Sequence, residues 1–188
     1  MKYRKLLILL LVMSLWGGTM IFADSAAQKV RVIVNGSELD DAGILSDGKT
    51  YLSVRQLAST LQSIVFWDEN AKKVTVYKPN VHMFLFQDNT IFGNVVKGNR
   101  ISFKVFAQID NLMTDISAVK VSIMNPGGAE TLIQSKNVSV KDYFWYRTDD
   151  ITYSFDSAGK YSILFYMKLT GTDDWKLVSE KTITAKTQ

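Results

Sequence analysis

The 188-residue sequence contains no cysteine, two prolines and a single histidine. The absence of cysteine excludes disulfides, thiolate catalysis and cysteine-based zinc sites, so the folded chain must depend on its apolar core. One histidine, His82, cannot hold copper or zinc without further ligands, and it lies in the alternating apolar stretch VHMFLF. We therefore expect no metal site and no cofactor, and we expect His82 to be an ordinary strand residue.

A strong charge of one sign is also missing. The formal net charge is +4, and it falls to +2 when the first 27 residues, with three basic groups and one acidic group, are left out. The sequence shows no cluster of lysine and arginine of the kind that nucleic-acid binding requires. We therefore expect no nucleic-acid partner.

A long apolar run occurs only near the N-terminus. A basic start precedes the apolar stretch Leu6–Met13, and Ser25-Ala26-Ala27 then supplies the small residues that a signal peptidase needs. The alternative is an uncleaved membrane anchor, but residues 6–22 are interrupted by polar residues and glycines and fall short of the roughly 20 apolar residues of a membrane span. We expect residues 1–27 to be a signal peptide cleaved after Ala27. The protein would then be secreted or at the cell surface, with membrane contact only if the segment is kept.

Residues 28–79 have the pattern of a small α+β module. Val30–Val34 is an apolar strand that ends at an Asn35-Gly36 turn, and Asp47-Gly48 marks a second turn. A short helix should follow, because Ser53 and Gln56 have the spacing of a capping box. Its apolar residues recur at helical spacing and should form a buried face: Val54, Leu57, Ala58 and Leu61. Further short strands are predicted at residues 50–52, 64–67 and 74–77.

Residues 80–188, beyond a boundary at Pro79-Asn80, contain no further helix pattern. Alternation of apolar and polar residues predicts antiparallel strands with one buried face each. Seven such strands separated by turns indicate an immunoglobulin-like (Ig-like) β-sandwich. They lie near residues 82–87, 101–109, 117–124, 131–136, 151–155, 160–168 and 175–184, with Trp175 at the start of the last.

The segment Asp156–Tyr161 supports the sandwich. Its sequence, DSAGKY, is similar to the turn and tyrosine corner that lead into strand F of Ig-like domains. Ile163 falls where antibody domains place a disulfide cysteine. The resemblance is therefore to the disulfide-free Ig-like class.

The stretches VIVNG, DGKTYLSVRQLASTL and VFWDENAKKVTVY, within residues 30–78, resemble the copper amine oxidase N-terminal (stalk) domain family. The resemblance implies an accessory, non-catalytic module, since copper and the tyrosine-derived quinone of the oxidases belong to a separate domain. That catalytic domain needs three histidines and a tyrosine motif, which this chain lacks. Within the module we assign Trp67 to the core, and we expect Arg55 to brace it through backbone carbonyls.

No catalytic residues are expected. The acidic doublets Asp40-Asp41, Asp149-Asp150 and Asp173-Asp174 lack the alternating spacing of a calcium loop, so we interpret them as solvated turn residues. The sequence has no G-x-S-x-G motif for a serine nucleophile.

The best candidate for binding is an aromatic run. Alternate side chains of a strand diverge, so four consecutive aromatic residues cannot all enter one core, and one or two should be exposed. Exposed aromatic rings stack on sugars or anchor proteins, whereas the alternative is that they close the sandwich or contact the first module. The candidate binding residues are Tyr143, Phe144, Trp145, Tyr146 and Arg147.

The sequence therefore predicts a secreted, non-catalytic cell-envelope protein that binds or spaces, with a cell-wall glycan or an envelope protein as partner. The alternative is an inhibitor or regulator of a secreted enzyme, with residues 142–150 as the inserted loop. A carbohydrate-active or amine-oxidising enzyme is the third hypothesis, and the missing copper ligands argue against it.

Overall fold

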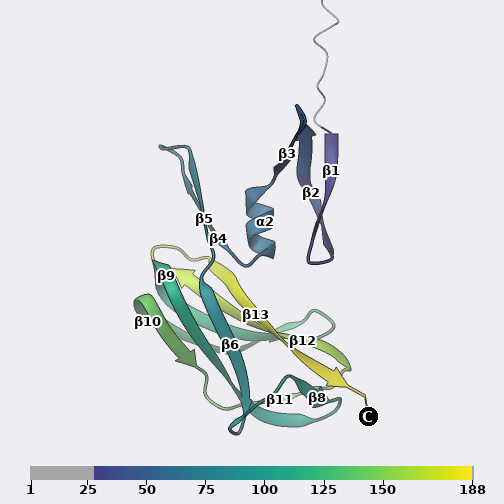
Figure 1. Cartoon of the computed structure of the whole chain (residues 1–188). Helices are drawn as coiled ribbons and strands as arrows, with labels where there is room; N and C mark the ends of the chain where they lie inside the picture. Colours follow the sequence, from purple (N-terminus) through teal and green to yellow (C-terminus); the bar gives the residue numbers. More distant parts are fainter. Residues whose placement is uncertain (1–27, 188) are drawn as a thin grey trace, which may run out of the picture. The chain divides into compact units, whose positions relative to one another are not determined.

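The computed structural model describes residues 28–187, which form two compact units, residues 28–53 and residues 54–187 (Figure 1). The predicted signal peptide and its cleavage site lie outside the described residues. Within the described part of the chain, no helix is both long enough and apolar enough to cross a membrane. The unit division falls inside the predicted module 28–79, and the boundary at Pro79 stays a prediction.

The first unit is a three-stranded antiparallel sheet of β1 (Gln28–Val34), β2 (Ser37–Ser46) and β3 (Lys49–Leu52). Two tight turns join its strands. Asn35 and Gly36 have φ angles of 52° and 83°, and Asp47 and Gly48 have φ angles of 50° and 70°. Two consecutive positive φ angles are typical of the hairpin turns that Asn-Gly and Asp-Gly favour, so both predicted turns are confirmed.

The second unit begins with helix α2 (Val54–Thr60) and the hairpin of β4 (Ile64–Asp68) and β5 (Lys73–Tyr77). The helix lies where it was predicted, but its buried face does not form as expected. Ala58 alone is buried, while Val54 and Leu61 are exposed. The reason is that the helix packs mainly against the single strand β4, so part of its apolar stripe stays uncovered among the described residues.

The remainder is a mainly β structure of the predicted sandwich type (Figure 1). One layer contains β6 (Asn80–Gln87), the first half of β9 (Arg100–Met124), the second half of β10 (Glu130–Arg147) and β11 (Ile151–Ser154). The other layer contains the remaining halves of β9 and β10. The second layer also contains β12 (Gly159–Leu169), β13 (Trp175–Lys186) and β8 (Asn94–Val96). The two-residue β7 (Thr90–Ile91) pairs with β6 of the first layer.

Strands β9 and β10 each pass from one layer into the other. At the crossing, Asn111 and Asp142 have positive φ angles of 53° and 71°, and the register between the strands shifts beside Asp142. Such bulges bend a strand sharply. The apolar side chains of both layers then face one core, which contains fully buried residues such as Val105, Ile123 and Phe165.

The predicted tyrosine corner is present. Tyr161 is buried, and its hydroxyl donates a hydrogen bond to the Ser157 carbonyl (3.1 Å) and accepts one from the Ser157 N–H (3.0 Å). The ring packs on Phe155 at a centroid distance of 4.9 Å. The corner fixes the entry into β12, as in Ig-like domains.

A second tyrosine ties the hairpin to the sandwich. The Tyr77 hydroxyl donates to the Asn111 carbonyl (2.5 Å) and accepts from the Met113 N–H (2.9 Å), on the two sides of the bulge in β9. Tyr77 and Ile64, which pair across the hairpin, are both part of the sandwich core. The base of the hairpin is therefore anchored, and its far end extends away from the core.

Candidate functional site

The predicted binding residues all lie in the second half of β10, where the pleat separates them into two sets. Tyr143, Trp145 and Arg147 are exposed, with 78% of Tyr143 and 66% of Trp145 accessible to solvent. Phe144 is half-buried against the core, and Tyr146 is buried beside Phe165. The expectation that one or two of these aromatic residues are exposed is confirmed. The segment is a strand up to Arg147, however, so the loop predicted at residues 142–150 is wrong.

The neighbouring strands add two phenylalanines to the exposed side of β10. Phe84 on β6 pairs with Phe106 on β9, and Phe106 pairs in turn with Arg147. The Phe106 and Trp145 rings are stacked, with centroids 6.2 Å apart and planes inclined by 22°. We call this surface the aromatic face and define it by Phe84, Phe106, Tyr143, Trp145 and Arg147.

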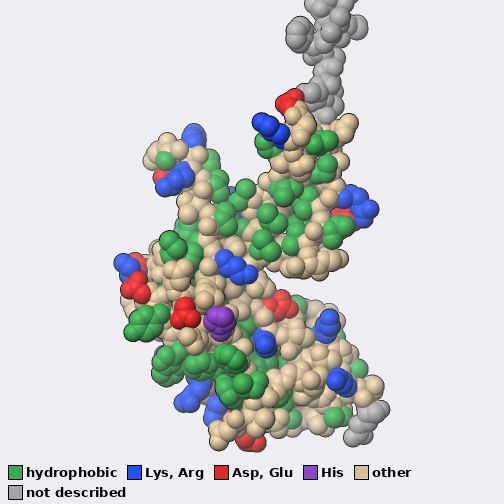
Figure 2. Space-filling model, in the orientation of Figure 1, with side chains coloured by type: hydrophobic (Ala, Val, Ile, Leu, Met, Phe, Trp, Pro, Cys, Tyr) green, Lys and Arg blue, Asp and Glu red, His purple; other side chains and the backbone are tan. Residues whose placement is uncertain are grey.

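Polar groups surround the aromatic face. His82 and Gln108 are paired across β6 and β9 next to Phe84 and Phe106, and Figure 2 shows hydrophobic side chains gathered beside the single histidine. Lys104 forms an ion pair with Asp150 (3.1 Å). A hollow of about 290 Å³ opens between Phe106, Arg147 and the turn at Asp88-Asn89. The surface thus combines exposed aromatic rings with neighbouring hydrogen-bonding and cationic groups.

Sequence reasoning identified the exposed part of the run in β10 but missed Phe84 and Phe106. The alternation in residues 82–87 and 101–109 indicated that every second side chain faces outward. It gave no information on which strands are neighbours, because strand order depends on tertiary pairing. Only the register of β6 with β9 and of β9 with β10 brings these rings together.

Two assignments in the predicted first module are wrong. Trp67 is half exposed, with 50% of its surface accessible, because β4 and β5 form a two-stranded hairpin with no further layer over it. Arg55 is exposed, and no hydrogen bond or ion pair of its guanidinium occurs among residues 28–187. It therefore does not brace backbone carbonyls. Outside that module, the prediction that Trp175 starts the last strand is confirmed, because Trp175 is the first residue of β13.

The acidic doublets pair with lysines. Asp41 contacts Lys29 (2.7 Å), Asp173 contacts Lys168 (2.8 Å) and Asp174 contacts Lys176 (3.4 Å). The doublet Asp40-Asp41 lies within β2 and not in a turn, because residues 37–46 pair with the neighbouring strands. Asp41 has a positive φ of 50° near the point where the register of β1 and β2 shifts. Within the described part of the chain, no three His, Cys, Asp or Glu side chains are grouped to hold a metal ion.

The fold and surface define a mainly β protein: a small sheet, a helix with a hairpin, and an Ig-like sandwich with an exposed aromatic face. The profile of the copper amine oxidase N-terminal domain matches residues 33–139, more than half of the chain. The chain belongs to this family, which confirms the resemblance drawn from residues 30–78. The match extends further than predicted, through the first strands of the sandwich into β10.

Two solved structures are similar to part of the chain. The CARDB domain of a Pyrococcus furiosus protein, crystallised with di-metal ions, is 12% identical with a TM-score of 0.34, covering 59% of this chain and 96% of that domain. The sporulation control protein Spo0M of Bacillus subtilis is 13% identical with a TM-score of 0.31, covering 59% of this chain and 50% of that one. No curated protein matches the chain.

Proposed function

We propose that the protein is an exported, non-catalytic module that binds a cell-envelope glycan through the aromatic face. The observation that carries the proposal is the exposure of Trp145 in a fixed orientation, stacked on Phe106 at the centre of the face. Family membership supports an accessory role. The basic, apolar and small-residue pattern of residues 1–27 supports export.

Exposure of these rings to water is unfavourable. Exposed Trp and Tyr side chains lose the free energy of burying their apolar surface, so a contiguous exposed aromatic patch is typical of a binding surface. Strands hold the rings in place, which lowers the conformational entropy lost on binding. Arg147, at the edge of the face, has no ion-pair partner among the described residues and is available to hydrogen-bond a ligand.

Co-sedimentation of the purified protein with insoluble cell-wall sacculi tests the proposal. We expect Trp145→Ala to weaken binding at least about tenfold, equivalent to about 1.4 kcal/mol, while the melting temperature stays nearly unchanged because the ring is exposed. Leu132→Ala is the matched control, since Leu132 is an exposed apolar residue of the same strand outside the aromatic face. Equal sedimentation of both variants and the parent protein would contradict the proposal.

A further inference from the structure

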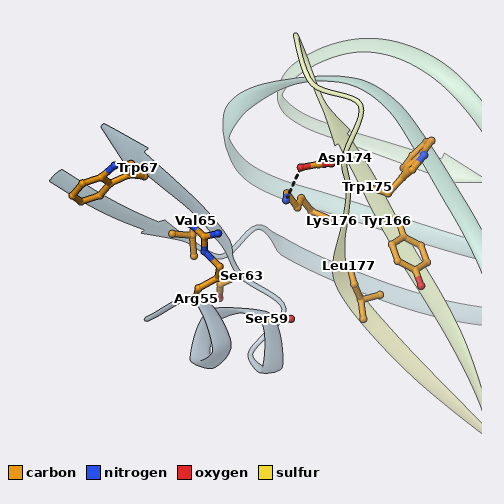
Figure 3. A pocket seen from close by; sticks show the side chains of 10 residues that line it. All are labelled: Arg55, Ser59, Ser63, Val65, Trp67, Tyr166, Asp174, Trp175, Lys176 and Leu177. Carbon is orange, nitrogen blue, oxygen red and sulfur yellow. Dashed lines mark hydrogen bonds and ion pairs between the residues drawn. The ribbon is translucent and has the colours of Figure 1, made fainter. Parts of the chain in front are cut away.

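A cleft of about 540 Å³ lies on the side of the second unit that is formed by β12 and β13 (Figure 3). One wall comes from α2 and β4 and carries Arg55, Ser59 and Trp67, and the other wall carries Tyr166 and Trp175. The cleft belongs to the opposite layer of the sandwich from the aromatic face, which β6, β9 and β10 form. The two surfaces therefore share no residue.

The wall of the cleft on β12 and β13 is held in place by a stack. The Lys120 ammonium lies 4.1 Å from the centroid of the Tyr166 ring and 5.4 Å from that of Trp175. The Tyr166 hydroxyl donates to Glu130 (3.0 Å), and Lys120 also contacts Glu130 (3.8 Å). Cation–π contacts and these polar contacts fix the orientation of both rings before any ligand binds.

The opposite wall supplies a second indole. Trp67 and Val65 lie on one face of the hairpin, opposite Val74 and Val76 on β5, so this face is entirely apolar. The indole N–H donates to Glu69 (2.5 Å), which fixes the ring while half of its surface stays accessible. Figure 3 shows Trp67 and Trp175 on opposite sides of the opening.

The charges in the cleft do not balance. Lys176 is paired with Asp174 (3.4 Å), whereas the Arg55 guanidinium has no acidic partner within residues 28–187. A planar guanidinium binds a carboxylate or phosphate through two parallel hydrogen bonds. The cleft thus offers one cationic group, hydroxyls on Ser59 and Ser63, and aromatic surface on two sides.

We propose that this cleft binds an acidic saccharide, with a sugar ring packed on an indole and its carboxylate or phosphate group paired with Arg55. The C–H face of a pyranose matches the electron-rich face of an indole, and the serine hydroxyls match the hydroxyls of the sugar. A nucleic acid would need several cations along its phosphates, and the cleft has one unpaired cation. The protein then has two saccharide sites on opposite layers, the second independent of the aromatic face.

Titrations of the purified full-length chain, followed by tryptophan fluorescence, test this site with a matched pair of disaccharides. N-acetylglucosaminyl-N-acetylmuramic acid carries a lactyl carboxylate that the neutral N,N′-diacetylchitobiose lacks, although the N-acetylated sugar rings are otherwise the same. We expect the acidic disaccharide to bind at least about tenfold more tightly, with Arg55→Gln removing the difference and Arg55→Lys keeping part of it. N-acetylglucosamine 1-phosphate is the phosphate arm, and Arg55-dependent binding of either acid supports the proposal.

Equal affinity for the acidic and neutral probes would overturn the proposal, as would unchanged binding of both acids by Arg55→Gln. Arg55 is exposed, so these substitutions should leave the fold intact, which the melting temperature checks. Trp145→Ala should keep the Arg55-dependent preference for the acidic over the neutral disaccharide, and loss of that preference in this variant would assign the acidic ligand to the aromatic face and refute the second site. Failure of this site leaves the dependence of sacculus binding on Trp145 unaffected, so the two proposals fail separately.

Discussion

Two buried tyrosines of the sandwich have opposite hydrogen-bonding environments. The Tyr161 hydroxyl both donates to and accepts from Ser157. The Tyr146 hydroxyl is buried and has no hydrogen-bond partner among residues 28–187, and this burial raises the pKa of Tyr146. A buried polar group without a partner is costly, whereas a satisfied one is stabilising.

The same substitution at these two positions should therefore act differently. We expect Tyr161→Phe to lower the free energy of unfolding by about 1–3 kcal/mol, because it leaves the backbone groups of Ser157 without their partner. Tyr146→Phe should be neutral or slightly stabilising, because it removes an unpaired hydroxyl. Urea unfolding of both variants measures this, and equal destabilisation would contradict the assigned environments.

Among the elements, the long strands show what the sequence could and could not predict. Residues 101–109 and 117–124 were predicted as separate strands, yet β9 continues through the polar residues between them. Asn111 tolerates a positive φ, so the chain bends by a bulge and not by a loop. The Asn-Gly and Asp-Gly turns were predicted correctly because their conformation depends on local residues alone.

Strand β2 was not recognised for a related reason. Its sequence, SELDDAGILS, has no clean alternation, because Asp40-Asp41 and Ala42-Gly43 interrupt it. The strand forms because it pairs with β1 on one side and β3 on the other. The turns at both ends, taken together, were the available indication.

Gly43 gives a test of the packing in this first sheet. A Cβ atom at Gly43 would lie 2.7 Å from a γ-methyl of Val30 and 2.7 Å from one of Val32. Both neighbours are β-branched and stiff, so they cannot yield easily. We expect Gly43→Ala to destabilise the sheet by about 1–3 kcal/mol, seen as faster amide hydrogen exchange in β1–β3. Gly93→Ala, where the added methyl meets nothing, is the control, and unchanged exchange in Gly43→Ala would contradict the packing.

For the whole molecule, stability should fall at alkaline pH. Burial, followed by the hydrogen bond to Glu130, raises the pKa of Tyr166 to about 12 from an ordinary value of 10.0. Burial also raises the pKa values of Tyr77 and Tyr153. A raised folded-state pKa means that the neutral tyrosine stabilises the fold. This contribution is complete below pH 10 and is lost as the pH rises towards 12.

We therefore expect the free energy of unfolding to decrease between pH 10 and about 12, and Tyr166→Phe to decrease less steeply over this range. Chemical denaturation at several pH values provides the measurement. The parent protein and the variant should differ in slope, and identical slopes would show that Tyr166 does not couple to folding.

The architecture places the aromatic face on paired strands of the sandwich, while the small sheet and the hairpin carry much exposed apolar surface of their own. Strand pairing holds the aromatic face, so it should bind without rearrangement. This face is the central element of the proposed function, since it combines the predicted run in β10 with rings from β6 and β9.

Mapping of amide and indole NMR shifts, on addition of solubilised cell-wall glycan fragments, tests the central claim most directly. The account predicts saturable shifts centred on the Trp145 indole and on the strand residues around Phe84 and Phe106. Shifts confined to other surfaces, with the Trp145 indole unmoved at saturation, would contradict it.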